Sequence, residues 1–263
     1  MPRGPRTGPW EAAPPVLVLP LHEHLAPAAW GASRERPGLR LGYVQTAGGA
    51  HRGPLSSDVA SLHGAGLLAG HLNAEPAYGG EHEAIGLVGA LDAAAGRLGW
   101  EAIVCGPGPG VDGAETRYEH GGMAELESAH AALALGLPTL LSPRLSGSDP
   151  RPRHRGLSEH TSWVLELLLA SVRVPVPEIQ LEGWPTGDQG PDEVDLPSVL
   201  DALHAACDDR HDVTVEPVDL EGFATSDLAR VSGHAVEADP LFFAAPLAAG
   251  AALAKAAPTA VKG

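Results

Sequence analysis

Short apolar runs alternate along most of the chain with longer segments in which apolar residues recur every three or four positions. The short runs predict buried strands at 15–20, 39–46, 68–76, 101–106, 138–144, 172–179 and 212–219. The longer segments predict helices at 22–32, 55–67, 81–99, 122–136, 158–171, 197–207 and 240–256. Strands that alternate with helices are typical of βαβ units. We therefore predict an α/β fold with a mostly parallel sheet and helices on both faces, doubly wound and Rossmann-like.

The segment 81–99 has the clearest helical pattern, and Gly99 would lie just after its end. Its apolar positions share one helical face: Ile85, Val88, Leu91 and Ala95. The two prolines of 172–179 predict that this strand lies at an edge of the sheet, because proline cannot donate a hydrogen bond to a neighbouring strand.

Other residues mark the ends of the remaining helices. Ser56 or Ser57 and Ser158 can accept hydrogen bonds from the first free backbone amides of a helix. Gly136 is placed to end one, and Pro246 to interrupt the last. The apolar stretch 239–250 predicts a helix packed on the sheet, with a dimer contact as the alternative and hence a possible homodimer.

The chain has 263 residues, a length that suits a single α/β domain, which we place at 14–257. Residues 1–13 read as a disordered Pro/Gly-rich leader and 258–263 as a tail, with 180–195 as a possible internal linker. Hydrophobic residues make up 44%, which excludes a disordered chain, and no apolar stretch is long enough for a membrane helix.

The formal net charge is −16, which argues against binding to nucleic acids or anionic membranes. Residues 176–240 hold much of this charge, with 16 acidic and two basic residues. Cys105 and Cys207 form no zinc or disulfide framework, and no signal peptide is recognisable at the start of the chain. We predict a cytoplasmic protein with reduced thiols.

Glycine-rich or charged loops follow four predicted strands, at 46–50, 77–81, 106–122 and 145–161. Ligands of open parallel sheets bind beyond the carboxyl ends of the strands, where these loops would meet. Glycines let the backbone approach a ligand closely. The first three loops supply these candidate ligand-binding residues: Thr46, Tyr78, Gly79, Gly80, Glu81, Gly106, Gly108 and Gly110.

Glu81 is placed near the predicted start of the 81–99 helix, where a carboxylate can act as a general base or, more simply, stabilise the helix end. The motif GPGPG at 106–110 is neither GxGxxG nor a Walker loop. The sequence therefore predicts no standard dinucleotide or P-loop site and identifies no cofactor.

The loop at 145–161 stands out by its charge. Four arginines fall within 144–155, and Asp149 is the only acidic residue among them. Arginine binds phosphate and carboxylate oxygens in pairs, and a helix start at Ser158 would add to the attraction. We predict an anion clamp made of Arg151, Arg153 and Arg155. The alternative is a solvated loop whose arginines pair with nearby acids.

Two histidines of this loop, His154 and His160, are the acid/base candidates, since histidine can exchange protons near neutral pH. Asp149 would orient one of them or an arginine. His22 and His24 could join these histidines in a metal site, but no spacing is diagnostic of a metal, so none is assigned.

Five stretches resemble a bacterial family known as domain of unknown function 3866, from about His22 to about Gly250: GYVQTAGGA, AYGGEHEAIGLVGAL, VCGPGPG, SDPRPRHRGLS and ADPLFFAAPLAAG. The resemblance implies no established activity. The chain departs from the family pattern at Glu159, where members often have a second histidine, and at Ala47, where they often have aspartate. Members commonly carry a longer segment ahead of the region that starts near Val16.

These patterns favour a protein that binds a small anionic metabolite, possibly a phosphorylated one, in a pocket formed by the loops beyond the strands. Whether it is an enzyme stays open. The second hypothesis is a non-catalytic protein whose arginine-rich loop docks an acidic partner or another copy of the chain. The third, weaker hypothesis is a metal-dependent hydrolase.

Overall fold

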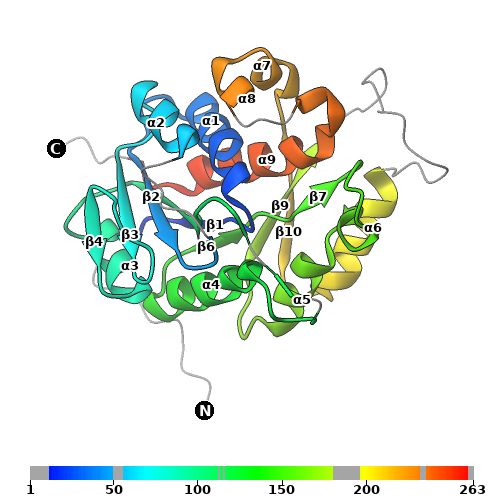
Figure 1. The fold of residues 1–263 in the computed structure, drawn as a ribbon, viewed down its shortest axis with the longest axis horizontal. Helices are drawn as coiled ribbons and strands as arrows, with labels where there is room; N and C mark the ends of the chain where they lie inside the picture. Colours follow the sequence, from blue (N-terminus) through cyan, green and yellow to red (C-terminus); the bar gives the residue numbers. More distant parts are fainter. Residues whose placement is uncertain are drawn as a thin grey trace.

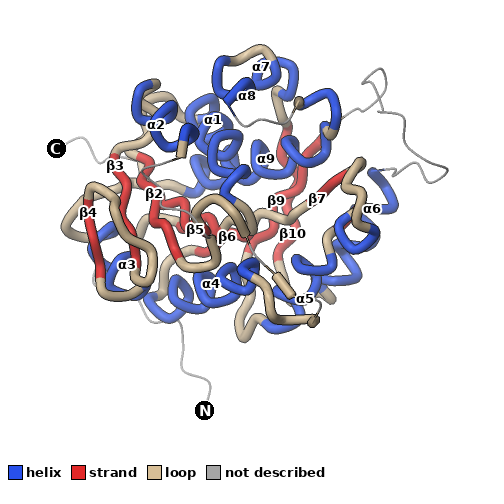
Figure 2. The backbone as a smooth tube through the Cα atoms, in the orientation of Figure 1, coloured by secondary structure: helices blue, strands red, loops and turns tan. Residues whose placement is uncertain are grey.

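The computed structural model describes residues 12–49, 56–111, 113–114, 116–179, 196–231 and 235–259. Its centre is a parallel sheet of eight strands in the order β10-β9-β6-β1-β5-β2-β3-β4 (Figures 1 and 2). The strands are β1 Val16–Val18, β2 Leu41–Thr46, β3 Gly70–Ala74, β4 His82–Ala84, β5 Ala102–Pro107, β6 Thr139–Leu141, β9 Arg173–Glu178 and β10 Asp212–Pro217. A separate antiparallel pair joins β7 Leu145–Ser146 to β8 Gly156–Leu157.

Helices cover both faces of the sheet (Figure 1). One face carries α1 Leu25–Glu35, α2 Ser57–Gly64, α7 Leu220–Ala224, α8 Asp227–Val231 and α9 Pro240–Ala256. The other carries α3 Leu87–Ala95, α4 Ala124–Leu135, α5 Glu159–Leu167 and α6 Leu196–Cys207. Short 3₁₀ turns lie at η1 His22–His24, η3 Gly121–Met123, η4 Pro152–His154 and η5 Val236–Ala238. This architecture confirms the doubly wound α/β fold.

The sheet separates two hydrophobic cores, and successive residues of β1 point into opposite ones. Leu17 packs with α1 and α9, whereas Val16 and Val18 pack on the side of α3 and α4. This alternation follows from the period of two residues in a strand. Because both faces are covered, the central strands read as continuous apolar runs in the sequence.

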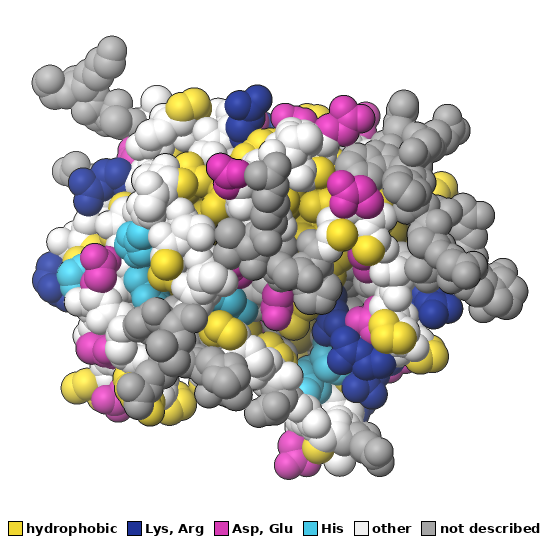
Figure 3. Space-filling view, turned by 45° about the horizontal axis from the view of Figure 1, so that its top comes forward, with side chains coloured by type: hydrophobic (Ala, Val, Ile, Leu, Met, Phe, Trp, Pro, Cys, Tyr) yellow, Lys and Arg dark blue, Asp and Glu magenta, His cyan; other side chains and the backbone are white. Residues whose placement is uncertain are grey.

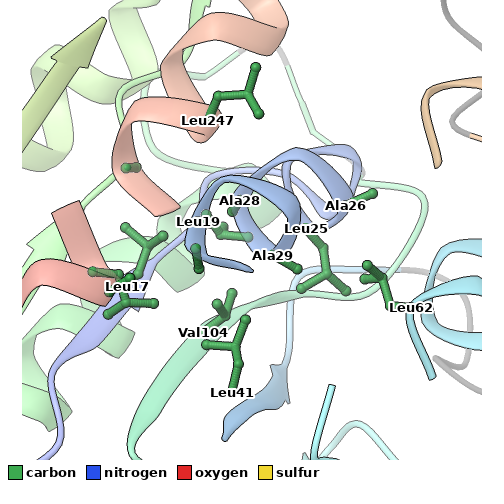
Figure 4. Close-up of a cluster of buried hydrophobic side chains, with 14 of the residues drawn as sticks. Leu17, Leu19, Leu25, Ala26, Ala28, Ala29, Leu41, Leu62, Val104 and Leu247 are labelled. Atoms are coloured by element: carbon green, nitrogen blue, oxygen red, sulfur yellow. The ribbon is translucent and has the colours of Figure 1, made fainter. Parts of the chain in front are cut away.

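Helices α1 and α9 approach so closely that their backbones touch at glycines (Figure 4 shows the surrounding cluster). A Cβ added at Gly31 would collide with the carbonyl oxygen of Leu247, and one at Gly250 with that of Ala28. The residues of α9 from Phe243 to Ala254 are all buried. This confirms a helix packed inside its own chain. The dimer contact that we gave as the alternative for 239–250 stays a prediction, and the residues of α9 from Phe243 to Ala254 are already covered within the chain.

Gly250→Ala is expected to destabilise the fold by about 1–3 kcal/mol, because the added methyl group must push the two helices apart. Urea unfolding measures this loss. Gly89→Ala is the matched control, since Gly89 also lies in a helix but nothing lies within 4 Å of an added Cβ. The control should be neutral or stabilising. Equal losses in the two variants would contradict the close approach.

The helix predicted at 81–99 is wrong in its first part. Residues His82–Ala84 form β4 on the edge of the sheet, and the helix begins only after Gly86. Ile85 is 90% exposed and Val88 51% exposed, so they do not belong to a buried helical face. The helical spacing of these residues arises by coincidence, and the extended backbone at Gly86 separates strand from helix. The helix ends with Gly96 as its C-cap, three residues before Gly99.

Two expectations about proline are also corrected. β9 is not an edge strand but lies between β6 and β10. β6 pairs with β9 only between Leu140 and Arg173, so most of the β9 edge that faces β6 forms no backbone hydrogen bonds with that strand. The prolines of β9 are tolerated for this reason. Pro246 lies inside α9, and the helix continues through it.

Three predicted helix ends are confirmed. The Ser56 side chain accepts hydrogen bonds from the amides of Asp58 and Val59, and Ser158 accepts one from His160. Gly136 ends α4 in the left-handed conformation, with φ of 75°. The linker expected at 180–195, most of the expected leader and most of the expected tail lie outside the described residues. None of the described helices has both the length and the apolar run that a membrane span requires.

Candidate functional site

The sheet has a topological switch point between β1 and β5. These strands are neighbours, but β1 leads to α1 on one face and β5 leads to α4 on the other. Their loops therefore diverge and leave a crevice at the carboxyl edge, which is where ligands bind in doubly wound folds.

A pocket of about 600 Å³ lies in this crevice. Its walls come from four segments: 20–23 after β1, 111–125 between β5 and α4, 144–160 after β6, and 235–243 at the start of α9. Small-molecule sites commonly have volumes of about 300–1,000 Å³. Figure 3 shows a face of the molecule on which basic side chains gather in a patch, with histidine beside them.

Asp149 holds two of the arginines in the pocket. One carboxylate oxygen accepts hydrogen bonds from Arg144, at 2.8 Å, and from the Arg151 guanidinium, at 2.9 Å; the other accepts from Arg151 Nε and its backbone amide. Burial opposes ionisation of Asp149, but these hydrogen bonds and the two positive charges outweigh it and hold its pKa well below the usual range. Asp149 thus orients arginines, and two of the four arginines of the loop are paired within it.

The other two arginines differ in exposure. Arg153 is exposed at the rim and donates from Nε to the Nε2 atom of His154, at 3.3 Å. Arg155 is half-buried and donates to the backbone carbonyl of Asp149, and it does not line the pocket. Arg153 is therefore the arginine of the predicted clamp that lines the pocket without a carboxylate partner among the described residues.

Three histidines form a contiguous cluster in the wall. The rings of His120 and His160 stack with centroids 3.6 Å apart, and the ring of His154 meets His160 edge-on at 4.5 Å. His154 Nδ1 also lies 2.8 Å from the hydroxyl oxygen of Ser158.

These histidines are held uncharged. Burial, reinforced by the charge of Arg144, lowers the pKa of His154 to about 3. Burial and the neighbouring His120 and His154 lower the pKa of His160 to about 3 as well. The lowered pKa values favour neutral rings, which can donate and accept hydrogen bonds. The acid/base role of His154 and His160 stays a prediction.

Two glutamates in the pocket have contrasting environments. Glu125, in the first turn of α4, is 1% exposed, and neither carboxyl oxygen has a hydrogen-bond partner among the described residues. Burial raises its pKa well above the usual range and so favours the uncharged acid. Glu23 is half-buried after β1 and contributes a carboxylate near Arg144. Both glutamates line the same pocket.

Asp239 fixes the start of α9 to the arginine-rich loop. Its carboxylate accepts hydrogen bonds from the Ser146 hydroxyl and from the Gly147 amide, the latter at 2.8 Å. The same carboxylate caps α9 at the amide of Phe242. The loop that carries Arg151 and Arg153 is anchored in this way to the opposite wall of the pocket.

A family model described as "Protein of unknown function (DUF3866)" matches residues 12–250. The chain belongs to this family. No curated protein and no solved structure matches the chain. The part of the chain that the DUF3866 model matches includes every residue that lines the pocket.

The structure of this DUF3866 protein brings together five of the residues expected in the site: Asp149, Arg151, Arg153, His154 and His160. The glycines of the 106–110 loop do not line the pocket, and Gly106 and Gly108 are packing positions. A Cβ at Gly106 would meet Leu19, and the backbone of Gly108 abuts Gly49. Gly110 has φ of 80° and serves the turn.

The β3–β4 loop also lies away from the pocket, and with it Tyr78, Gly79, Gly80 and Glu81. Glu81 does not cap a helix. Its carboxylate accepts a hydrogen bond from the backbone amide of His71, at 3.1 Å. Thr46 is buried at the end of β2 and donates to the carbonyl of Ala47.

The two histidines after β1 have structural surroundings in this DUF3866 protein. His22 contacts the hydroxyl groups of Ser56 and Tyr43, and His24 packs edge-on against Phe242. Among the described residues, no group of three or more histidine, cysteine, aspartate or glutamate side chains is arranged to hold a metal ion. The geometry therefore gives no support to the metal-dependent hydrolase.

The sequence did not indicate that Glu125, Glu23 and Asp239 line the pocket. It also did not place His120 among the acid/base candidates. The signal that could have identified Glu125 is its place one turn after His120-Gly-Gly, at the helix start that follows a central strand.

Proposed function

We propose that this protein binds a small anionic metabolite, possibly a phosphorylated one, in the pocket at the switch point. The observation that carries the proposal is a set of buried polar atoms in the walls that have no hydrogen-bond partner within the described part of the chain: Nε of Arg144 and both carboxyl oxygens of Glu125. A buried polar atom without a hydrogen bond costs about 1–3 kcal/mol. A ligand with matching groups would remove this cost, which supports a binding role for the pocket.

The charges support an anion as the ligand. Arg153 lies at the rim, and no acidic side chain among the residues that the structure describes pairs with its guanidinium. Asp149 fixes Arg144 and Arg151 in place. Fixed guanidinium groups bind oxyanions at a small cost in side-chain entropy. The neutral rings of His154 and His160 can add hydrogen bonds without adding charge. The proposal commits to binding and to no reaction.

Arg153→Ala is expected to weaken the binding of an anionic ligand by about tenfold to one hundredfold, which corresponds to one charge-assisted hydrogen bond. A thermal-shift panel of phosphorylated metabolites, nucleotides and carboxylates, followed by calorimetry of the hits, measures the change. Arg173→Ala is the matched control. It removes the same charge from an exposed arginine that pairs with Asp212 at the start of β9.

Equal affinities in the Arg153 and Arg173 variants would exclude Arg153 from the anion site. A panel without any hit would favour the second hypothesis, an interaction protein whose arginine-rich loop docks an acidic partner. Salt-dependent self-association in light scattering would then support that role. We further propose a cytoplasmic location, which the buried, free thiols of Cys105 and Cys207 support.

A further inference from the structure

The exposure of the lining side chains orders the pocket from rim to floor. Arg151 and Arg153 are exposed, whereas Arg144 is 7% and Glu125 1% exposed. All four line the same pocket. A ligand whose anion contacts Arg153 at the rim can therefore extend inward to the buried part of the pocket, where Glu125 lies.

The floor around Glu125 is built from the turn that joins the β5 loop to α4. Gly122 lies three residues before Glu125 and lines the pocket with it. A Cβ added at Gly122 would lie 2.9 Å from Nδ1 of His120 and 3.6 Å from Nδ1 of His160. Both ring nitrogens therefore face the space that the missing side chain leaves. Neither nitrogen of His120 has a hydrogen bond of normal geometry among the described residues.

We propose that this floor is a subsite for hydroxyl groups, so that the ligand is a hydroxylated organic oxyanion of the sugar phosphate or sugar acid class. The inference rests on the proposed function and specifies the ligand of the same pocket. An uncharged carboxylic acid offers one donor and several acceptor positions, and a neutral imidazole offers one of each. A hydroxyl group likewise donates and accepts, so it can satisfy Glu125 and His120 together.

Other ligand groups fit the floor less well. An ammonium group only donates, and it would require Glu125 to lose its proton in a buried position. An alkyl group would leave both carboxyl oxygens of Glu125 without partners. A hydroxyl group gives the carboxyl oxygens of Glu125 hydrogen-bond partners and leaves the floor of the pocket uncharged.

The test compares four probes by calorimetry with the full chain: ribose 5-phosphate, gluconate, ethyl phosphate and phosphoethanolamine. We expect ribose 5-phosphate to bind about tenfold more tightly than ethyl phosphate, which has the anion without the hydroxyl groups. Gluconate carries several hydroxyl groups on a molecule whose anion is a carboxylate. Its rank relative to ribose 5-phosphate identifies the anion, and binding of either one more tightly than ethyl phosphate supports the subsite.

Substitutions of Glu125 test the role of the floor directly. Glu125→Gln keeps a neutral group that donates and accepts, so the preference for ribose 5-phosphate should persist within about threefold. Glu125→Leu fills a similar volume without polar atoms and should abolish the preference for ribose 5-phosphate over ethyl phosphate. Its melting temperature should equal or exceed that of the wild type, because an unsatisfied buried group is removed.

Gly122→Ala is a second, independent variant that narrows the same space and leaves Glu125 intact. It should also reduce the preference for ribose 5-phosphate. Persistence of the preference in both Glu125→Leu and Gly122→Ala overturns the inference. If phosphoethanolamine binds most tightly and its binding releases the proton of Glu125, the floor is an ammonium subsite and the inference is overturned. If ethyl phosphate and both hydroxylated probes bind equally tightly, the hydroxyl subsite is overturned but the proposed anion binding is not. If none of the four probes binds, the proposed function is overturned as well.

Discussion

Lowering the pH from 7.5 to 5 is expected to destabilise the protein by on the order of 3 kcal/mol, a large share of the stability of a typical domain. The cause is a set of buried histidines. Burial lowers the pKa of His24, His154 and His160 to about 3 and that of His71 to about 4. In the unfolded chain these side chains titrate near 6.5.

The sign follows from proton uptake. Between pH 6.5 and about 3 the unfolded chain binds more protons than the folded one at these histidines, so stability is full above pH 6.5 and falls as the pH decreases. Each of the four costs about 2 kcal/mol by pH 5. Glu125 and Asp58 act in the opposite direction, since burial raises their pKa, that of Asp58 to about 6. Together the four histidines cost up to about 8 kcal/mol, and the two carboxyl groups offset part of that cost, which leaves a net loss on the order of 3 kcal/mol.

Urea unfolding at a series of pH values measures the effect, and a stability that stays flat between pH 7.5 and 5 would contradict it. His24→Leu provides the control. Both ring nitrogens of His24 are buried, and neither has a hydrogen-bond partner in the described ranges of the chain. Leucine therefore removes a titrating group and breaks none of the hydrogen bonds that the structure describes. The variant should lose about 2 kcal/mol less than the wild type on acidification.

Asp149→Ala is expected to destabilise the protein by about 3–5 kcal/mol, because it leaves the Arg144 guanidinium buried without its partner. The side chains of Arg144 and Asp149 are each 9% exposed, so water cannot replace the lost contact easily. The variant should also lose affinity for anionic ligands, since Arg151 is no longer fixed. Urea unfolding and calorimetry measure the two effects.

Asp212→Ala is the matched control for that substitution. Asp212 pairs with Arg173 at the surface, with both side chains about half exposed, and such pairs contribute only about 0–1 kcal/mol. The double variant Arg144→Met with Asp149→Ala should recover part of the stability, since it removes the unpaired charge itself. A loss for Asp149→Ala no larger than for Asp212→Ala would show that the buried pair contributes little.

Local signals in the sequence were sufficient for much of the fold. The caps at Ser56, Ser158 and Gly136 were predictable because capping depends on neighbouring backbone atoms only. The start of α3 was not, because strand β4 exists through its pairing with β3, and three residues give no period of their own. The internal place of β9 also depends on strand order, which no local pattern encodes.

The site was predictable where its residues lie in one charged loop. The sequence identified Asp149, Arg153 and their neighbours because four arginines within twelve residues are unusual in an acidic chain. It could not indicate that Asp149 pairs with Arg144 and Arg151, because geometry alone decides between an anion site and an internal salt bridge. Glu125 was hidden for a similar reason: its burial comes from other segments that fold over it.

The walls of the pocket come from opposite ends of the chain, from 20–23 after β1 and from 235–243 at the start of α9. During synthesis the ribosome adds about 5–20 residues per second, so on the order of ten seconds or more separate the emergence of these two walls. The nascent chain must therefore complete most of the sheet before the pocket exists. A metabolite that binds there stabilises the finished fold and takes no part in guiding its early stages.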